Sequence, residues 1–250
     1  MFPELVIFNI AISMYPLCVA IGFLFGMIVA DLVSSRFLVS KNESYILMCL
    51  IEIGVVIGGK VLYLLINIKQ ISKYYNSFGL IGLFTKTGFV FYGGLFGGLT
   101  AIKLFAMAIK KSFFRCSSLA FSVTPLIHAF GRLGCFCAGC CYGKVWSGKL
   151  TVCYKNEYRF PVQLLESSLN FLLFILFIIL IYKNKTYFIC SLYMFFYGII
   201  RSICEFFRGD ISRGFMGPIS ISTWISILCI LIGIFVFLLL KKKDKNEQPH

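Results

Sequence analysis

Long apolar runs separated by short polar segments dominate the chain. Seven of these runs are about 20 residues long, which is the length that a helix needs to cross the hydrocarbon core of a bilayer. Apolar side chains lie all round them, as in helices that face lipid. We predict membrane-spanning helices over residues 13–33, 44–67, 88–109, 117–140, 162–182, 187–207 and 220–240. The expected fold class is therefore all-α, a polytopic integral membrane protein.

Composition agrees with this interpretation. Hydrophobic residues make up 59% of the 250 residues and charged residues 14%, whereas soluble domains have about 45–50% and about 25%. We find no internal repeat and no low-complexity linker. The chain is therefore expected to form a single membrane domain over residues 1–240, followed by a basic cytoplasmic tail over residues 241–250.

The charge distribution predicts the orientation. The net charge is +14, but the basic residues lie singly in loops except for the stretch "KKKDK" at 241–245. A basic cluster directly after a span is typical of the cytoplasmic face. Seven spans then place the C-terminus in the cytoplasm and the N-terminus outside. The expected partners are membrane lipids rather than nucleic acid, and the two longest outside loops, about 68–87 and 141–161, could gate an entrance.

Ionisable residues within the spans are candidates for a functional site because charge is costly there. They are Glu52, Lys60, Lys103, His128, Arg132, Glu166, Arg201 and Glu205, with Arg208 at a span end. Arg201, Glu205 and Arg208 are spaced i, i+4, i+7, which puts them on one helix face. They could form a structural ion-pair stripe. Two arginines around one glutamate leave spare positive charge, however, and this favours an anion such as a lipid phosphate.

A second group lies in "HAFGRLGCFCAGCCYGK", residues 128–144. His128 and Arg132 are one helical turn apart, and the glycines between and after them permit close approach of a backbone or a lipid. A histidine in a span is often a packing residue. Beside an arginine its charged form is disfavoured, so it would stay neutral and able to accept a proton.

The same stretch contains four cysteines in the pattern C-x-C-x-x-C-C. Zinc sites usually combine two separated ligand pairs, and the sequence has no second pair of this kind. On a continuous helix Cys137 and Cys141 face one way and Cys135 another. The alternatives are a metal site, a disulfide from Cys140 or Cys141 to Cys153, or small residues that line a site or pack helices.

"GRLGCFCAGCCYGK" resembles a degenerate form of the signature of the prolipoprotein diacylglyceryl transferase family. Five further stretches that resemble this family occur in the expected order. They are "ISMYPLCVAIGF" near the start, "GGKVLYLL" from Gly58, "GFVFYGGLFGG" from Gly88, "RFPVQLLES" from Arg159 and "YGIIRSICEFFRGD" from Tyr197. The resemblance covers nearly the whole chain, and the family shares the seven-span plan with an outside N-terminus.

The resemblance implies an enzyme of the bacterial cytoplasmic (inner) membrane. It would transfer diacylglycerol from phosphatidylglycerol to the lipobox cysteine thiol of an exported prolipoprotein and release glycerol phosphate. No metal or organic cofactor is expected. The candidate catalytic residues are Arg132, Arg201, Glu205 (the carboxylate partner of both arginines), His128 and Tyr92. The candidate substrate-binding residues are Tyr15, Lys60, Gly93, Gly94, Gly131, Cys135, Gly143, Gln163, Glu166 and Arg208.

The chain departs from the family pattern at several positions. Cys135 and Cys140 stand where the signature has asparagine and glutamate, and Tyr92 stands where a His-Gly-Gly stretch has histidine. Lys144 replaces the final arginine of the signature, and Thr223 a glutamine of the last span. Tyrosine is a poor base near neutral pH. Our hypothesis is that His128 has taken over as base, so that His128→Gln would abolish turnover and leave lipid binding intact.

Other functions are compatible with the same residues. A divergent paralogue would bind the same phospholipid and modify another acceptor, and a non-catalytic scaffold would bind it without consuming it. A membrane thiol protein would use the cysteines for redox chemistry or metal handling. A transporter would line a pathway with the ionisable residues, although the chain lacks the paired broken helices expected of an inverted repeat.

Overall fold

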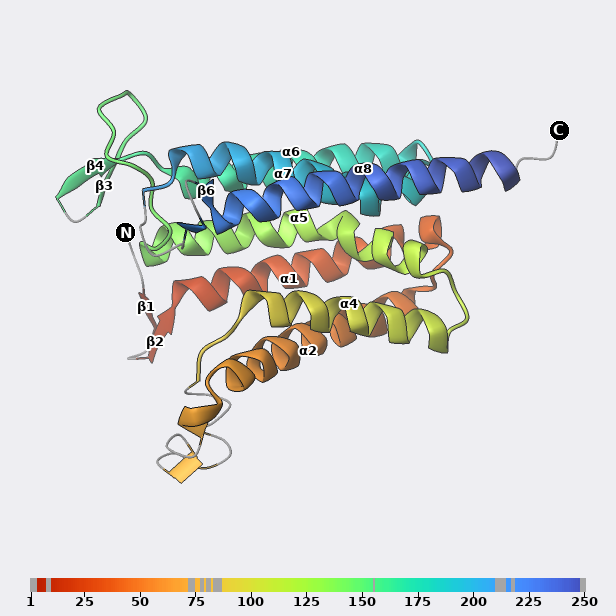
Figure 1. Ribbon diagram of the computed structural model, residues 1–250, viewed down its shortest axis with the longest axis horizontal. Coiled ribbons are helices and arrows are strands. Elements are labelled where there is room, and N and C mark those ends of the chain that lie inside the picture. The colour runs from red at the N-terminus through yellow and green to blue at the C-terminus, as the bar shows by residue number, and fades with distance from the viewer. Residues whose placement is uncertain are drawn as a thin grey trace.

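The structure is a computed structural model, and it describes residues 4–7, 10–71, 75–76, 79, 82, 87–154, 156–209, 215–216 and 219–247. Seven long helices run roughly parallel to one axis (Figure 1). They are α1 (Met14–Val33), α2 (Lys41–Ile66), α4 (Phe91–Ala108), α5 (Phe113–Ala138), α6 (Val162–Tyr182), α7 (Ile189–Phe207) and α8 (Ile221–Glu247). Within the described ranges these seven are long and apolar enough to cross a membrane. The predicted all-α fold with seven spans is confirmed.

Helix ends differ from the prediction where local signals set them. Ser40 and Glu43 form a capping box, in which each side chain accepts a hydrogen bond from the other's backbone N–H, so α2 begins three residues earlier than predicted. Gly139 takes the left-handed conformation with φ 68° and ends α5 at Ala138. α8 continues through the lysine cluster to Glu247, so the first part of the predicted tail is helical.

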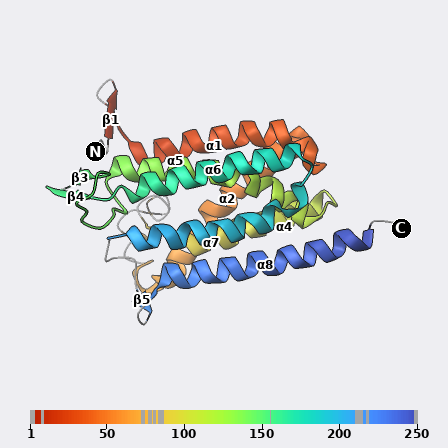
Figure 2. The same ribbon diagram turned by 90° about the horizontal axis from the view of Figure 1, so that it is seen from above.

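Short strands and 3₁₀ helices are found outside the seven long helices. The pairs are β1 (Glu4–Ile7) with β2 (Ile10–Ser13), β3 (Val152–Tyr154) with β4 (Glu157–Arg159), and β5 (Phe215–Met216) with β6 (Ile219–Ser220), all antiparallel. The 3₁₀ helices are η1 (Ser34–Phe37), η2 (Ile68–Gln70) and η3 (Thr186–Phe188). The strands gather at the end of the bundle that carries the N-terminus, and the C-terminus lies at the opposite end (Figures 1 and 2). In the predicted loop of about 68–87, one of the two that could gate an entrance, most of residues 72–86 lie outside the described residues.

Helix α5 is the centre of the bundle. It packs against α1, α6 and α7, while α7 packs on α8 and α2 on α4 (Figure 2). Its buried face includes Cys116, Leu119 and Val123, all fully buried. Two of the predicted charged groups, those near residues 132 and 201, are therefore on neighbouring helices of the packed centre.

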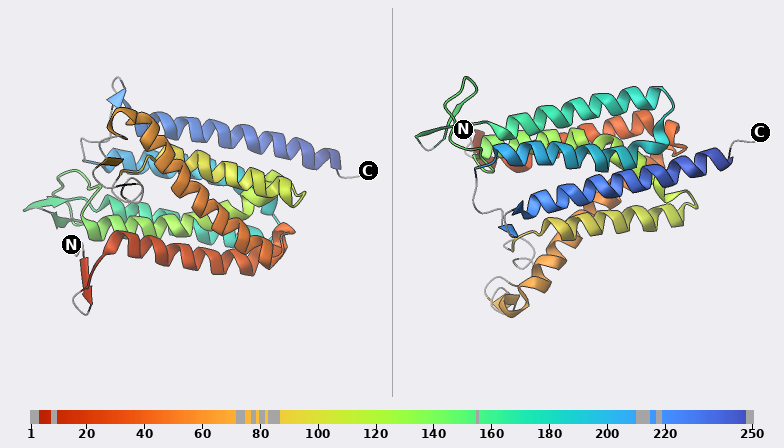
Figure 3. Two further views of the ribbon diagram at one scale, coloured as in Figure 1. Left: turned by 90° about the horizontal axis from the view of Figure 1, so that it is seen from below. Right: turned by 45° about the horizontal axis from the view of Figure 1, so that its top comes forward.

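Helices α2 and α4 cross with their backbones in contact (Figure 3). Gly54 and Gly58 of α2 face Gly93 and Gly97 of α4, so both helices carry the small-xxx-small pattern that allows membrane helices to approach closely. A Cβ atom on Gly97 would lie 2.0 Å from the Gly54 carbonyl oxygen, and one on Gly93 would lie 2.2 Å from that of Gly58.

Gly97→Ala is expected to lower the free energy of unfolding by about 1–3 kcal/mol, because the added methyl has to push two backbones apart. The matched control is Gly131→Ala, whose Cβ would have Val19 Cγ2 at 3.9 Å as its nearest neighbour. Thermal unfolding of both variants in the same detergent checks this. Equal midpoints for the two variants would contradict the role of the α2–α4 contact.

Candidate functional site

A buried carboxylate on α6, Glu166, lies at the centre of the charged residues. Its side chain is 2% exposed. Arg132 Nη2 of α5 lies 2.9 Å from Glu166 Oε1, and Arg201 Nη1 of α7 lies 3.5 Å from Glu166 Oε2. Because each buried charge is costly unless it is paired, this bridge fixes three helices relative to one another.

Arg201 connects the site to α8 as well. Its Nη2 donates a hydrogen bond to Ser222 Oγ at 2.9 Å and lies 3.3 Å from Glu205 Oε2. The i, i+4 pair of Arg201 and Glu205 is thus formed as its spacing predicts. Ser222 was not among the predicted residues, since a serine in an apolar span carries no signal of its own.

The carboxylate that bridges both arginines is Glu166, and this corrects the expectation that Glu205 has that role. Glu205 lies on the same helix as Arg201 and pairs with it locally. Helix α6 packs against both α5 and α7, which carry Arg132 and Arg201, so its glutamate reaches both. Contact of Glu166 with substrate stays a prediction.

His128 faces the same carboxylate as Arg132. Its Nε2 lies 3.6 Å from Glu166 Oε1, and its ring centroid is 5.7 Å from that of Tyr197. The i, i+4 spacing on α5 therefore places both side chains in the site, as predicted. An imidazolium at this position would lie beside the Glu166 carboxylate, but also close to the Arg132 guanidinium, which disfavours its charge.

The site has more positive than negative charge. Three arginines, Arg132, Arg201 and Arg208, accompany two carboxylates, Glu166 and Glu205, and all five side chains are buried or nearly so. Arg132 Nε and Arg201 Nη1 are buried and donate no hydrogen bond to any group in the described part of the chain, although Arg201 Nη1 is ion-paired with Glu166. Two guanidinium groups with donors to spare form an arrangement that can bind an anion with several oxygens, such as a phosphate.

Gly143 lies where three segments meet. It pairs as a β-bridge with Arg208, while Lys144 N–H donates to the Phe207 carbonyl at 2.9 Å. A Cβ on Gly143 would lie 2.2 Å from the Phe160 carbonyl oxygen. Close backbone contact therefore accounts for the presence of glycine at position 143, and a role of Gly143 in substrate binding stays a prediction.

Arg208 is not on the helical face that we predicted for it. Helix α7 ends at Phe207, and Arg208 has an extended backbone with ψ 141° that pairs with Gly143. The helical i+7 position therefore does not apply, because strand pairing with the loop replaces the next helical turn. Its side chain is nevertheless buried at the same end of α7.

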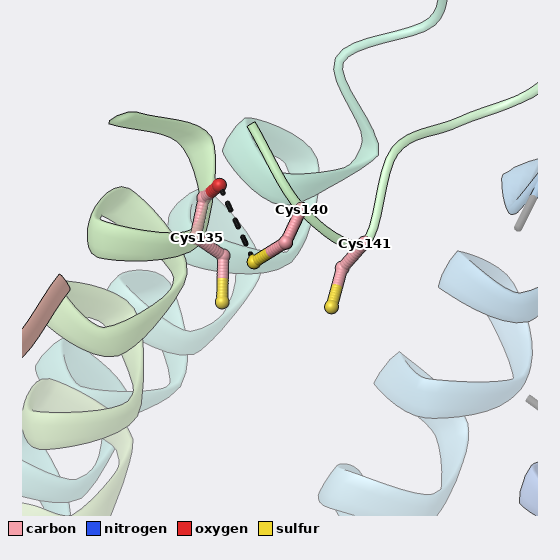
Figure 4. A group of neighbouring side chains, drawn as sticks. All are labelled: Cys135, Cys140 and Cys141. Atoms are coloured by element: carbon pink, nitrogen blue, oxygen red, sulfur yellow. Dashed lines mark hydrogen bonds between the residues drawn. The ribbon is translucent and has the colours of Figure 1, made fainter. Parts of the chain in front are cut away.

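The cysteines are arranged differently from the helical prediction. Because α5 ends at Ala138, Cys141 is not on the helix, and the Sγ atoms of Cys135, Cys140 and Cys141 lie within 4.8 Å of one another (Figure 4). Cys137 is not part of this group. None of the eleven cysteines, each within the described part, is in a disulfide, so a bridge to Cys153 is not formed. Partial burial and the neighbouring Cys141 thiol raise the pKa of Cys140.

Gln163 and Tyr15 lie around this loop. Gln163 Nε2 donates a hydrogen bond to the Cys140 carbonyl at 2.7 Å, so the predicted substrate-binding glutamine holds the cysteine loop in place. Tyr15 lies in the first turn of α1, and its hydroxyl lies close enough to Arg132 and Cys135 to interact with them electrostatically. Both residues therefore belong to the neighbourhood that we predicted.

The remaining candidates lie on α2 and α4. Tyr92, in the first turn of α4, is partly exposed and lies within electrostatic reach of Arg201. Lys60 donates a hydrogen bond from Nζ to the Thr87 carbonyl at 2.6 Å. Gly93 contacts Gly58, and Gly94 lies against Phe89 and Val55. The structure gives Lys60 and the two glycines contacts with this helix pair and with the segment before α4, and contact of any of them with substrate stays a prediction.

The fold and the site define a multi-pass membrane protein with a buried, net-positive arginine–glutamate centre. A sequence model of the family described as prolipoprotein diacylglyceryl transferase matches residues 3–239. The chain belongs to this family, as its motifs indicate. The resemblance is confirmed across the whole described bundle, and the chain is a diacylglyceryl transferase of the membrane.

Relatives agree with this assignment. The phosphatidylglycerol–prolipoprotein diacylglyceryl transferase of Clostridium tetani (strain Massachusetts / E88) is 33% identical over 241 residues, which cover 92% of this chain and 94% of that protein. The protein named phosphatidylglycerol–prolipoprotein diacylglyceryl transferase 2 from Clostridium perfringens (strain 13 / Type A) is 31% identical over 204 residues, which cover 77% of each chain. The phosphatidylglycerol–prolipoprotein diacylglyceryl transferase of Helicobacter hepaticus (strain ATCC 51449 / 3B1) is 28% identical over an alignment of 263 positions. The alignment covers 92% of this chain and 87% of that protein.

Proposed function

We propose that this chain transfers the diacylglyceryl group of phosphatidylglycerol to the lipobox cysteine thiol of exported prolipoproteins in the bacterial cytoplasmic membrane. The observation that carries the proposal is the pair of buried arginines on one bridging carboxylate, with N–H donors left over. The relatives from Clostridium tetani and Clostridium perfringens, 33% and 31% identical to this chain, are named for phosphatidylglycerol and prolipoprotein. We place the N-terminus outside, where exported precursors emerge.

The reaction follows from the charges of the site. The thiolate sulfur forms a bond to the glycerol carbon of the diacylglyceryl group, and the bond from that carbon to the phosphate oxygen breaks. The electron pair stays on the oxygen, and glycerol phosphate leaves with an additional negative charge. Arg132 and Arg201 bind that phosphate, and their fixed donors stabilise the charge as it develops.

His128 is the proposed acceptor of the thiol proton. It lies one turn from Arg132, and its imidazolium would lie 3.6 Å from Glu166 Oε1. The same carboxylate therefore orients both arginines and stabilises the protonated base. Tyr92 is the second candidate at the α4 side of the site, within electrostatic reach of Arg201.

Gly131 supports access of a lipid beside Arg132. A Cβ there would meet nothing nearer than Val19 Cγ2 at 3.9 Å, so packing does not require glycine at this position. The space that the missing side chain leaves is next to the phosphate-binding arginine. An acyl-glycerol backbone could approach there without displacing a side chain.

The function is tested with purified protein, phosphatidylglycerol vesicles and a synthetic lipobox peptide with a single cysteine. We expect the peptide to gain the mass of one diacylglyceryl group. His128→Gln is expected to abolish this gain while phosphatidylglycerol still binds, because the base is removed and the arginines remain. A fully active His128→Gln enzyme would refute the base assignment.

The control peptide has serine in place of cysteine and should gain nothing. Bound phosphatidylglycerol without any gain in the cysteine peptide would count against the prolipoprotein acceptor. That result would support a paralogue that modifies another acceptor.

A further inference from the structure

The three clustered cysteines are held together by the way α5 ends. Gly139 reverses the chain, its N–H donates to the Phe136 carbonyl at 3.2 Å, and Cys140 N–H donates to the Cys135 carbonyl at 3.1 Å. These are the hydrogen bonds of a Schellman-type helix end. The next residue, Cys141, has a positive φ of 55°, which is uncommon for a residue other than glycine. The backbone thereby returns two cysteines to the last turn of the helix.

Contacts from other segments keep this loop in place. Gln163 of α6 binds the Cys140 carbonyl, and Gly209 N–H donates to the Tyr142 carbonyl at 3.1 Å. In Figure 4 the Cys140 sulfur lies between those of Cys135 and Cys141. The three thiols are therefore brought together before any ligand binds, and little ordering would be needed to use them.

The distances fit a thiolate metal site. Sulfur ligands lie about 2.3 Å from Zn²⁺, so in a tetrahedral site they lie about 3.8 Å apart. The observed Sγ atoms are within 4.8 Å of one another and need to close by about 1 Å at most. Three thiolates select soft or borderline ions rather than Mg²⁺ or Ca²⁺.

We propose that Cys135, Cys140 and Cys141 bind one thiophilic divalent cation, with Zn²⁺ as the probe, and that its fourth position receives the acceptor thiol. Among the described residues no fourth cysteine, histidine or carboxylate completes the cluster. Three protein ligands with one open position are characteristic of catalytic zinc sites, whereas structural sites have four.

The electrostatics of the site suit this ion. One Zn²⁺ with three thiolates carries a net charge of −1. Arg132 lies close enough to Cys135 and Cys141 to interact with both electrostatically. His128, Arg132 and Cys135 are spaced i, i+4, i+7 on α5, so base, phosphate-binding arginine and metal ligand share one helix face.

The role of the metal rests on the proposed transfer reaction. A thiol that coordinates Zn²⁺ is deprotonated. The proton of the acceptor thiol passes to His128, and the metal-bound sulfur attacks the glycerol carbon. As the carbon–oxygen bond to the phosphate breaks, the electron pair leaves with glycerol phosphate, and the thioether product dissociates from the metal. The ion does not change oxidation state.

The test uses the full-length protein, stripped with a chelator and reloaded with Zn²⁺ or Co²⁺. We expect one metal ion per chain, lost in Cys141→Ser and retained in the matched control Cys137→Ser, which lies in the same segment outside the cluster. The thiolate-to-Co²⁺ charge-transfer absorption should rise by about a third on addition of the cysteine peptide, as four thiolates replace three. The serine peptide should leave it unchanged.

Activity gives the second readout. Chelation at pH 7 should lower transfer about 30-fold, because only a few per cent of a free thiol with a pKa of about 8.5 is ionised there. The chelated enzyme should recover about tenfold per pH unit up to that pKa, whereas the zinc-loaded enzyme should not show this rise.

Several outcomes would overturn the proposal. These are absence of metal uptake, equal loss of metal from Cys137→Ser and Cys141→Ser, or transfer that chelation does not change. A chain that takes up no metal and is lighter by two hydrogens would show a disulfide instead. Metal uptake with the expected response to the cysteine peptide, but with no transfer at any pH, would support the metal site and count against the transfer reaction.

Discussion

Arg201→Lys is expected to lower diacylglyceryl transfer by about 10²–10³-fold although the positive charge is kept, which is the loss typical when one fixed donor to a developing anion is removed. The guanidinium of Arg201 contacts Glu166, Ser222 and Glu205 at once, from three helices. The single ammonium of lysine cannot reproduce this planar arrangement, so the donor that faces the phosphate would no longer be fixed.

The measurement is the initial rate of peptide modification at several phosphatidylglycerol concentrations. The loss should lie mainly in kcat, since the charge that attracts the lipid remains. Arg36→Lys is the matched control, because Arg36 is exposed and its contacts, a hydrogen bond to Asn184 and the ring of Tyr182, lie outside the site. It should retain wild-type activity. An Arg201→Lys enzyme with a transfer rate within tenfold of wild type would show that the three simultaneous contacts of the guanidinium group are not needed.

The parts of the site that the sequence predicts are those set by local spacing. His128 with Arg132, and Arg201 with Glu205, are one helical turn apart, and a helix places such pairs on one face regardless of what surrounds it. The seven spans are likewise predictable, because lipid demands apolar residues over a fixed length. Both predictions agree with the structure.

Contacts between helices could not be predicted in the same way. The bridge from Glu166 to two arginines depends on how α6 packs against α5 and α7, and the hydrogen bond of Ser222 depends on α8. The sequence of a single apolar span does not indicate which other helices pack against it. Arg208 left the predicted helix face for the same reason, because a β-bridge to Gly143 competes with the next helical turn.

The cysteine cluster is an intermediate case. Gly139 stands directly after the last apolar turn of α5, and glycine at this position is a common helix terminator. A helix that ends there would have separated Cys141 from Cys137 and returned it toward Cys135. The prediction placed Cys135 and Cys141 on different helix faces because it continued the helical period through that glycine to residue 140.

Glu166→Gln is expected to destabilise the protein by about 3–5 kcal/mol, the cost typical of removing one partner of a buried ion pair. The carboxylate, 2% exposed, is the bridge between Arg132 and Arg201. Glutamine has nearly the same shape, so the loss reports charge rather than volume. Without the carboxylate the two guanidinium groups lie near each other with less compensation.

Unfolding in a detergent free of anionic lipid measures this effect. Glu157→Gln is the matched control, since Glu157 pairs with Arg159 at the surface with half of its side chain exposed. Exposed pairs contribute about 0–1 kcal/mol. A Glu166→Gln protein as stable as the control would show that the bridge does not hold the three helices together.

Phosphatidylglycerol should partly reverse the loss, and this links the stability of the site to its ligand. A lipid that binds only the folded state stabilises it according to its affinity. In Glu166→Gln the arginines have lost the negative charge that they share, so a phosphate beside them should bind more tightly than in the wild type. The shift of the unfolding midpoint on addition of phosphatidylglycerol should therefore be larger for Glu166→Gln than for wild type, while zwitterionic phosphatidylcholine should shift neither. Equal shifts would mean that the phosphate does not bind at these arginines, because repulsion between carboxylate and phosphate beside the same two guanidinium groups is what makes the two proteins differ.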